Sequence, residues 1–359
     1  MKSNKETGPD DIPADVWKVL GDRGSVWLAT LFNKIVAGGR TPDVWQTSVT
    51  VPVWKGKGDI ASIDCTSYRP IRLLCHTMKV FERVLEARLR KIVSVSLKQC
   101  GFVKYCSTID AIHDVRILLE KHREKNRSVH LAFLDLEKGF DRVPHELLWM
   151  SMRSHRVPEK YVRWTKLLYV KPTSVDRCAA VQVGVHQGSS LSPLLFILCM
   201  DTITKEIQKQ HPWTLLFADD VMLASESRDD LQKQVQSWKD QLQQYGLRLN
   251  TSKTEYMECG PRIEDGSIRV DGTELNKLNC FKYLGSKVTS TGDIDQESRA
   301  RVNAAWMKTT EQVTPWNYPK KGFENKSKHT SHLKNGREAD RSSRGETRRT
   351  RLYRTILDV

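Results

Sequence analysis

The stretch from Thr214 to Ser225 reads TLLFADDVMLAS and decides the fold of this chain. Two apolar runs, each with the length and composition of a short buried strand, flank the acidic pair Asp219 and Asp220. The pattern predicts a β-hairpin with two adjacent carboxylates at its tip. Adjacent carboxylates repel each other unless a cation compensates their charge, which points to a divalent metal. Taken alone, the pair fits a solvated turn equally well, because aspartate tolerates turn conformations.

A second acidic segment lies upstream, where residues 133–144 read FLDLEKGFDRVP. Asp135 ends a predicted hydrophobic strand, a position where a carboxylate is costly to bury without a partner. Glu137 and Asp141 follow in a polar turn that leads into a helix. A third carboxylate at a strand end is what a pair of oxygen-ligated Mg²⁺ ions would need. Two such ions suit an in-line displacement at phosphorus, one activating a 3′-hydroxyl and one stabilising the leaving pyrophosphate.

A third segment, residues 184–201, reads GVHQGSSLSPLLFILCMD. Gly184 and Gly188 allow close approach of the backbone, and Gln187 at such a bend could touch a base or sugar edge. Ser190 or Ser192 is expected to cap a long helix that runs from about 190 to 208. On its own this pattern is weak, because helix N-termini are common structural features.

Hydrophobic periodicity elsewhere predicts helices that pack on the sheet. One helix begins near Thr77, and another over 229–245 carries apolar residues at alternating spacings of four and three. The first buried face is Phe81, Leu85, Leu89 and Ile92, and the second is Leu231, Val235, Trp238, Leu242 and Tyr245. Because strands and helices mix without regular βαβ alternation, the predicted class is α+β with a largely antiparallel sheet.

Composition narrows the class of partner. The chain has 359 residues and a formal net charge of +15, which favours an acidic polymer, above all nucleic acid. Charge alone does not decide this, because some soluble proteins are simply basic. Eight cysteines are scattered without a C-x-x-C pair, which argues against a zinc module and a secreted disulfide framework. Without a signal-like or membrane-length apolar run, a soluble intracellular protein is expected.

The order and spacing of the three segments resemble the reverse transcriptases of non-LTR (LINE-type) retrotransposons, and most of all the RTE/BovB-like lineages. FLDLEKGFD is followed about fifty residues on by GVHQGSSLSP, and about thirty residues beyond that by FADD. Further blocks agree with the likeness, namely GPDDIPADVWK, YRPI, KVFE, QCGF, STID, GLRLNTSKTEYM and FKYLGS. The resemblance covers roughly residues 5 to 310.

By this resemblance the fold is the right hand of a polymerase. The reverse transcriptase domain spans residues 1–285, with fingers over about 1–128 and an antiparallel palm over about 129–285. The start of a thumb is expected over 286–317. Residues 318–359 are basic and poor in apolar side chains, which predicts a disordered tail. The thumb is then incomplete, and the hairpin CAAVQVGV before Gln187 is short, so the chain resembles a truncated or degraded copy.

The resemblance also assigns roles to residues. Asp135, Asp219 and Asp220 match the catalytic carboxylates, which would hold two Mg²⁺ ions, with Mn²⁺ as an alternative. Phe140 matches the bulky residue beneath the incoming sugar, where a ring excludes the 2′-hydroxyl so that the product is DNA. The residues implied to meet the nucleotide are Arg69, Gln187, Gly188, Lys253 and Lys55 or Lys57. Tyr283, Leu284 and Gly285 match the primer grip.

Each nucleotide contact has a chemical reason. Arg69 offers a cationic fork that suits triphosphate oxygens, and Lys253 would give a proton or charge to the leaving group. The implied function is RNA-directed DNA polymerase, with deoxynucleoside triphosphates, a template RNA and a DNA primer as partners and no membrane. The implied location is the nucleus, the cytoplasm or both, as a ribonucleoprotein.

Two other functions compete with this one. The first is a catalytically inactive relic that still binds nucleic acid, which the short hairpin and the incomplete thumb favour. The intact carboxylates favour the active enzyme. The second is an RNA-templated RNA polymerase, which shares the paired aspartates but is disfavoured by Phe140.

Overall fold

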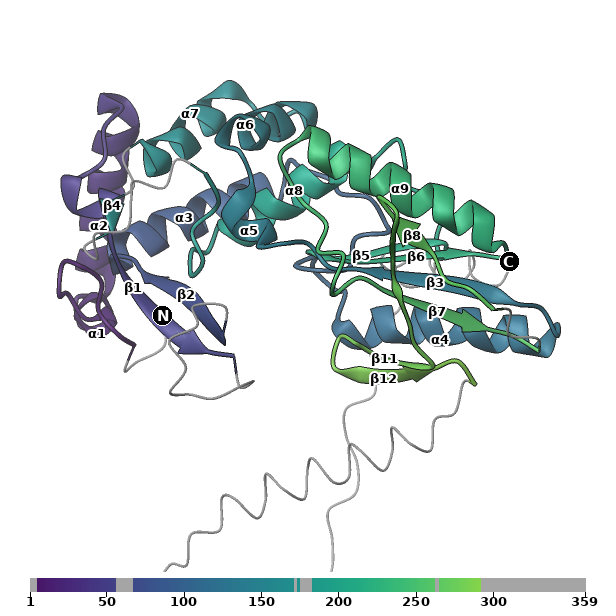
Figure 1. Cartoon of the computed structure of the whole chain (residues 1–359). Coiled ribbons are helices and arrows are strands. Elements are labelled where there is room, and N and C mark those ends of the chain that lie inside the picture. The colour runs from purple at the N-terminus through teal and green to yellow at the C-terminus, as the bar shows by residue number, and fades with distance from the viewer. Residues whose placement is uncertain (1–4, 56–66, 171–172, 175–182, 262–264, 292–359) are drawn as a thin grey trace, which may run out of the picture.

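The computed structural model describes residues 5–55, 67–170, 173–174, 183–261 and 265–291. Four expectations lie outside these residues in whole or in large part: the role of Lys57, the short hairpin before Gly184, the thumb and the basic tail. The described elements form two groups, one around a five-stranded sheet and one around a three-stranded sheet (Figure 1).

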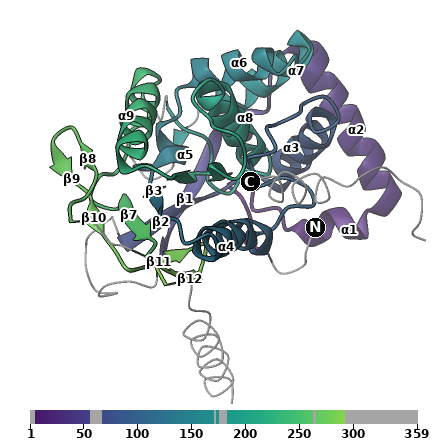
Figure 2. The same ribbon diagram turned by 90° about the vertical axis from the view of Figure 1, so that its right-hand side faces the viewer.

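The five-stranded sheet has the strand order β10-β7-β3-β6-β5. Its strands are β3 (Val129–Leu134), β5 (Thr214–Phe217), β6 (Asp220–Ser225), β7 (Glu255–Cys259) and β10 (Asn276–Lys277). Every pair except β10–β7 is antiparallel, so the predicted α+β class with a largely antiparallel sheet is confirmed. All six residues of the central strand β3 are buried, because helices lie on both faces of the sheet (Figures 1 and 2).

Helix α9 (Arg228–Gln244) covers one face of the sheet and contacts β3 and β6. The predicted stripe is confirmed, since the side chains that α9 turns to the sheet include Leu231, Val235, Trp238 and Leu242. Tyr245 follows the end of the helix and packs partly buried against the same core. The amphipathic period therefore placed this helix correctly.

Truncating this stripe should destabilise the fold. Leu242→Ala is expected to lower the free energy of unfolding by about 2–4 kcal/mol, because Leu242 is fully buried and its removal leaves a cavity. Urea denaturation followed by circular dichroism measures the loss. Gln243→Ala is the matched control, since the neighbouring Gln243 is exposed and its change should stay below about 0.5 kcal/mol. Equal losses in both variants would contradict this packing.

Helix α4 (Thr108–Glu124) covers the opposite face. It begins with a capping box in which the side chains of Ser107 and Asp110 each bond the other's backbone amide. Its buried residues Val115 and Leu118 belong to the same core cluster as Leu131 of β3. This helix comes from the segment predicted as fingers, yet its core partners are the strands of the predicted palm.

Helix α8 (Ser192–Thr204) forms the centre of the larger core. Eleven of its 13 residues are buried, so it must be covered on every side, and it packs on α6 (His145–Ser154) and α9. The helix is shorter at both ends than the predicted 190–208. Helix α3 (His76–Leu89) buries Phe81, Leu85 and Leu89 as predicted, but Ile92 lies beyond its end and is 38% exposed.

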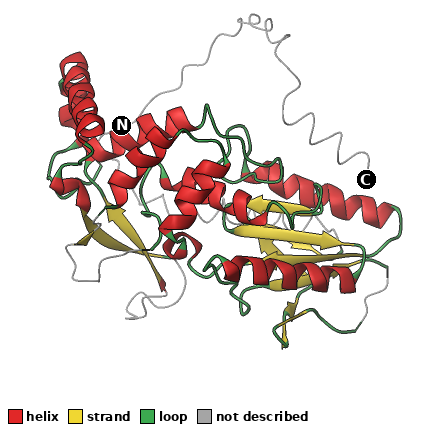
Figure 3. Ribbon diagram, turned by 90° about the horizontal axis from the view of Figure 1, so that it is seen from above, coloured by secondary structure: helices red, strands yellow, loops and turns green. Residues whose placement is uncertain are grey.

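The second group of elements carries the three-stranded sheet, with the order β2-β1-β4. Its strands are β1 (Thr47–Trp54), β2 (Tyr68–Leu73) and β4 (Thr173–Ser174), and around it lie α1 (Ala14–Val19), α2 (Gly21–Gly38), η1 (Asp43–Gln46), α3, α7 (Glu159–Lys166) and η3 (Leu167–Tyr169). Seen from above, the two sheets lie apart, with helices between them (Figure 3). Antiparallel pairing of β1 with β2 sets Arg69 opposite Val53, two residues before Lys55.

Two small hairpins complete the described fold. They are β8 (Arg269–Val270) with β9 (Thr273–Glu274), and β11 (Cys280–Tyr283) with β12 (Ser286–Thr289). A short helix, α5 (Gly139–Arg142), follows β3 closely. Within the residues given above, none of the helices combines the length and the apolar character needed to cross a bilayer.

Candidate active site

The predicted acidic hairpin is present as strands β5 and β6. Phe217 pairs with Asp220, so Ala218 and Asp219 form a tight two-residue turn. Ala218 has φ of 60°, a left-handed conformation that is strained for a residue with a Cβ. A conformation of this kind persists only where its surroundings hold it in place.

A buried glutamine holds that turn. The Gln99 side-chain carbonyl accepts hydrogen bonds from the backbone amides of Ala218, at 3.0 Å, and Gly101, at 2.8 Å. A Cβ on Gly101 would lie 2.3 Å from the Ala218 nitrogen, so only glycine permits this approach. The segment that precedes α4 thus fixes the tip on which the two aspartates stand.

Asp135 follows the end of β3 and lies beside the turn. Its backbone carbonyl accepts a hydrogen bond from the Asn250 amide at 2.8 Å, and the Asn250 side chain bonds its carboxylate. The Lys253 ammonium lies 4.0 Å from Asp135 Oδ2. The predicted residues Asp135 and Lys253 are therefore brought together, although Lys253 stays largely exposed.

The three carboxylates influence one another electrostatically. Loss of water raises the pKa of Asp219, and Asp135 raises it further. For Asp220, restricted hydration together with Asp219 and Asp135 raises the pKa to about 7, although its side chain keeps contact with solvent. Burial also raises the pKa of Asp135, against the opposing charges of Lys253 and Lys55. This cluster is short of positive charge.

Two cations near the three-stranded sheet act electrostatically on this cluster. Arg69 of β2 opposes the rise in the pKa of Asp219, and Lys55, just after β1, opposes the rise in the pKa of Asp135. Charge effects of this kind weaken with distance. The predicted phosphate-binding cations therefore influence the acidic residues, although they come from a group of elements distant in sequence.

Phe140, the predicted sugar gate, is held between two aromatic rings. Its ring stacks on Phe196 of α8, with centroids 4.2 Å apart and planes at 11°. Phe102 meets it edge-on, at 6.2 Å. Since Phe196 is fully buried, it fixes the orientation of Phe140, whose own ring is only partly covered.

The predicted residues Gln187 and Gly188 lie in a turn from His186 to Ser190, termed the Gln187 turn. Gln187 Nε2 donates to both carboxylate oxygens of Asp141, at 2.8 and 2.9 Å. Gly188 has φ of 106°, and a Cβ there would lie 2.7 Å from the Arg72 carbonyl oxygen. Glycine is therefore required at this point, as the sequence suggested.

The predicted cap of α8 was wrong. The hydroxyl that caps the start of the helix belongs to Ser189. Its Oγ accepts hydrogen bonds from the backbone amides of Leu191, at 3.1 Å, and Ser192, at 3.2 Å. Ser192 cannot do this, because it is itself the first residue of the helix and an N-terminal cap must precede the amides that it receives. Ser190 Oγ instead accepts a hydrogen bond from Arg83 Nε at 3.5 Å.

Glu82 of α3 is a buried carboxylate that joins this turn. It is 1% exposed and accepts hydrogen bonds from Ser189 Oγ at 2.8 Å and the Ser190 amide at 2.9 Å. Burial raises its pKa to about 7, and the two bonds and Lys79 oppose the rise. The carboxylate is therefore neutral in part of the folded molecules near pH 7.

This raised pKa makes the stability depend on pH. The folded state holds a proton on Glu82 up to about pH 7, whereas an unfolded glutamate releases it near pH 4.3. Glu82 therefore contributes its full stabilisation below about pH 4.3, and this stabilisation is lost as pH rises through about 7. Relative to Glu82→Gln, wild-type protein should lose on the order of 2 kcal/mol between pH 5 and 8. Denaturation at both pH values measures this, and parallel profiles would contradict it.

Tyr283, Leu284 and Gly285 lie at the tip of the β11–β12 hairpin. Leu284 and Gly285 have φ of 48° and 89°, as in the tight turns typical of hairpins. Tyr283 is 2% exposed and packs against Phe133 of β3. The hairpin is thereby anchored on the sheet, with the two turn residues at its end.

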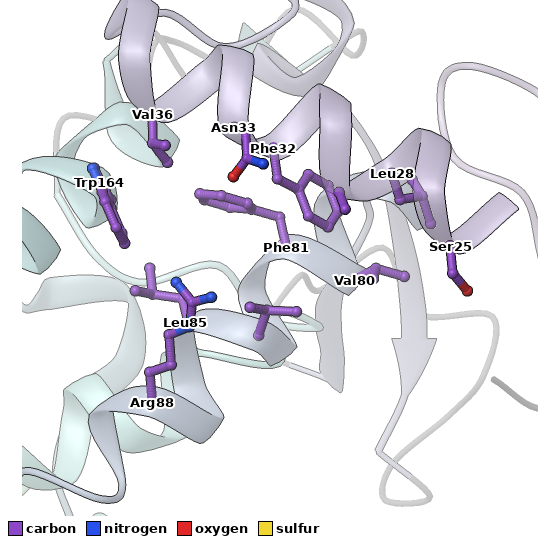
Figure 4. A pocket seen from close by; sticks show the side chains of 12 residues that line it. Ser25, Leu28, Phe32, Asn33, Val36, Val80, Phe81, Leu85, Arg88 and Trp164 are labelled. Carbon is purple, nitrogen blue, oxygen red and sulfur yellow. The ribbon is translucent and has the colours of Figure 1, made fainter. Parts of the chain in front are cut away.

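One apolar pocket lies away from this site, among α2, α3 and α7 (Figure 4). Its volume is about 320 Å³, and Phe32, Phe81 and Trp164 line it, with Arg88 at its border. It contains none of the residues predicted to act in the site. This pocket and the charged residues of the predicted site therefore lie in separate parts of the fold.

Sequence reasoning missed Gln99, Asn250 and Glu82 as parts of this site. Gln99 stood inside a quoted block, QCGF, but nothing in that block reveals which backbone it meets. Asn250 and Lys253 share the quoted segment GLRLNTSKTEYM, and their spacing of three could have suggested a common turn. Glu82 stood inside another quoted block, KVFE, but that block does not reveal its partners, which lie more than one hundred residues away.

In the described part of the chain, no three acidic, histidine or cysteine side chains gather closely enough to form a metal site as they stand. The carboxylates Asp135, Asp219 and Asp220 nevertheless fit a hard divalent cation in chemistry, since all three offer only oxygen. Burial and neighbouring carboxylates raise the pKa values of Asp219 and Asp220, and a bound cation would offset both effects.

Comparisons with known proteins identify the family of this chain. The profile of the family described as Reverse transcriptase (RNA-dependent DNA polymerase) matches residues 55–288. The chain is 26% identical to the Retrovirus-related Pol polyprotein from type-1 retrotransposable element R2 of Nasonia vitripennis, over 85% of this chain and 32% of that protein. It is 26% identical to the RNA-directed DNA polymerase from mobile element jockey of Drosophila funebris, over 79% of this chain and 33% of that protein.

Among solved structures, telomerase from Candida tropicalis in complex with a fragment of telomeric RNA is similar, with 14% identity and a TM-score of 0.49 over 76% of this chain and 49% of that one. The chain spans about a third of the length of the curated relatives named above. The family profile covers more than half of the chain, including all three acidic residues, both cations and the Gln187 turn. The chain therefore belongs to the reverse transcriptase family, with the right-hand polymerase fold.

Proposed function

We propose that this chain is an active RNA-directed DNA polymerase that extends a DNA primer along a template RNA with deoxynucleoside triphosphates. The observation that carries the proposal is the acidic β5–β6 turn beside Asp135 and its neighbour Lys253, whose ammonium lies 4.0 Å from Asp135 Oδ2. The charges of Arg69 and Lys55 also act on these carboxylates. Cations from one sheet and carboxylates from the other are the two halves of a triphosphate site. The relatives named as RNA-directed DNA polymerases support the same reading.

Each group then has a task. Asp135, Asp219 and Asp220 would hold two Mg²⁺ ions, or Mn²⁺, and bound ions of this kind lower the pKa of a 3′-hydroxyl and balance charge on phosphates. Arg69 and Lys55 would bind triphosphate oxygens. Phe140 would lie beneath the sugar and exclude a 2′-hydroxyl, while Gln187 and Gly188 would border the nucleotide. Lys253, beside Asp135, would stabilise the leaving group.

The rest of the chain is assigned in the same way. The primer grip is Tyr283 to Gly285, on the hairpin anchored to the sheet. The fingers would extend to about residue 128 and the palm to about 285, with α4 packed beneath the palm. We assign the chain to the RTE/BovB-like lineage of non-LTR retrotransposons. The enzyme would work with its RNA in the nucleus, the cytoplasm or both, as a ribonucleoprotein.

The test is primer extension on poly(rA)/oligo(dT) with dTTP. Wild-type protein should extend the primer with Mg²⁺, lose activity in excess chelator and regain it when the ion is restored. Substitution of Mn²⁺ should also support synthesis. A folded protein that binds the template–primer but adds no nucleotide with either ion would favour the inactive relic.

A further inference from the structure

The Gln187 turn is held by side chains from two parts of the fold that are not adjacent in sequence. Glu82 comes from α3, beside the three-stranded sheet, and Asp141 comes from α5, just after β3. Neither carboxylate belongs to the group proposed to hold metal. The described contacts show both of them directed at the turn.

Glu82 fixes the C-terminal half of the turn. Both of its oxygens accept hydrogen bonds there, one from the Ser189 hydroxyl and one from the Ser190 amide. Ser189 Oγ itself accepts hydrogen bonds from the backbone amides of Leu191 and Ser192, at the start of α8. A buried carboxylate is unfavourable unless its hydrogen bonds are satisfied. This position of Glu82 therefore requires the turn to keep its shape.

Asp141 fixes the side chain of Gln187 itself. A carboxylate only accepts hydrogen bonds, so the amide must turn its NH₂ group toward Asp141. The carbonyl oxygen Oε1 then lies at the other end of the amide. Asp141 also follows Phe140 directly in sequence, which links the orientation of Gln187 to the proposed sugar gate.

The backbone of the turn is joined to β2. The Arg72 amide donates to the Gln187 carbonyl at 2.9 Å, and Gly188 packs on the Arg72 carbonyl. Strand β2 also carries Arg69, three residues earlier. A shift of the turn would therefore change the spacing between Gln187 and the proposed triphosphate-binding cation.

We propose that Glu82 and Asp141 are positioning residues that hold the Gln187 turn in the shape that binds the incoming nucleotide. The proposal rests on the function proposed above. It assigns both residues to nucleotide affinity and not to the chemical step or to template–primer binding. A purely structural role would instead change stability and every kinetic constant together.

The variants Glu82→Ala, Glu82→Gln and Asp141→Ala test this in primer extension. Glu82→Ala and Asp141→Ala should raise the KM for dTTP about tenfold, because each loses the hydrogen bonds that its carboxylate accepts from the turn. The kcat and the KM for template–primer should stay within about threefold of wild type. Glu82→Gln should keep a KM for dTTP close to that of wild type, since its Oε1 can still accept a hydrogen bond from the Ser190 amide.

Matched controls are acidic residues outside the Gln187 turn. Glu86→Gln changes the next acidic residue of α3, whose partner is Arg90, and Glu146→Gln changes an exposed residue of α6. Both should keep wild-type constants. A folded Glu82→Ala with wild-type KM for dTTP would overturn the proposal. The proposal would also be overturned if the variants changed the KM for dTTP and the KM for template–primer equally, in proportion to their unfolded fraction. If Glu82→Ala does not fold, a wild-type KM in Asp141→Ala overturns it.

Failure of the polymerase function is distinguishable. If wild-type protein extends no primer, that function falls, and equilibrium dialysis with dTTP and Mg²⁺ measures nucleotide binding in its place. Weaker binding by Asp141→Ala than by Glu146→Gln would then support the positioning role. Equal binding by both variants would overturn it.

Discussion

Asp219→Asn is expected to reduce primer extension by at least three orders of magnitude while RNA binding stays intact or becomes slightly tighter. The substitution keeps the size of the side chain and removes a charge from the cluster in which Asp135 and Asp220 are coupled to it. Loss of an oxygen ligand would weaken ion binding and transition-state stabilisation, which carry most of phosphoryl transfer. RNA phosphates would meet less negative charge.

The measurement combines single-turnover extension with filter binding at fixed salt. Asp229→Asn is the control, since Asp229 is an exposed aspartate in the first turn of α9 and lies outside the site. Its activity should equal that of wild type. Comparable extension by Asp219→Asn and wild type would show that the acidic turn is not the catalytic site.

Phe140→Val is expected to lower the preference for deoxyribonucleotides over ribonucleotides by about a hundredfold. The ring cannot move aside, because Phe196 stacks beneath it and Phe102 closes its edge. Valine removes most of the ring and leaves space for a 2′-hydroxyl, and steric selection by one group is worth roughly 1–3 kcal/mol or somewhat more in rigid sites.

Competing incorporation of dTTP and UTP on poly(rA)/oligo(dT) measures that preference as a ratio of kcat/KM values. Phe32→Val is the control, because Phe32 lines the distant pocket among α2, α3 and α7. It should leave the ratio unchanged. An active Phe140→Val enzyme with wild-type selectivity would remove Phe140 from this role.

The parts of the fold that could be predicted are those with local signals. The stripe on α9 could be predicted because helical periodicity is written in consecutive residues, and the β5–β6 hairpin because its two apolar runs are separated by a short polar turn. The fold class followed from the mixed order of such elements. The sites of Asp135, Asp219 and Asp220 followed from the order and spacing of family motifs.

Contacts between distant segments could not be predicted. Gln99 meets Ala218 across 119 positions, and Glu82 meets Ser189 across 107, and no local pattern encodes such pairs. Three serines within Ser189 to Ser192 make the helix cap ambiguous by one or two residues, and only the helix start resolves it. Burial of Glu82 was also invisible, because a glutamate within an amphipathic helix is usually an exposed residue.

The central position of β3 has a consequence for synthesis of the chain on the ribosome. Both neighbours of β3 come later, since β6 begins at Asp220 and β7 ends at Cys259. The nascent chain therefore carries a strand of mostly apolar residues with two unpaired edges until β6 and β7 have been made, and such edges invite aggregation. Because these pairings are long-range, the sheet should close slowly. We expect newly made chains truncated before β7 to be bound by chaperones that recognise extended apolar segments.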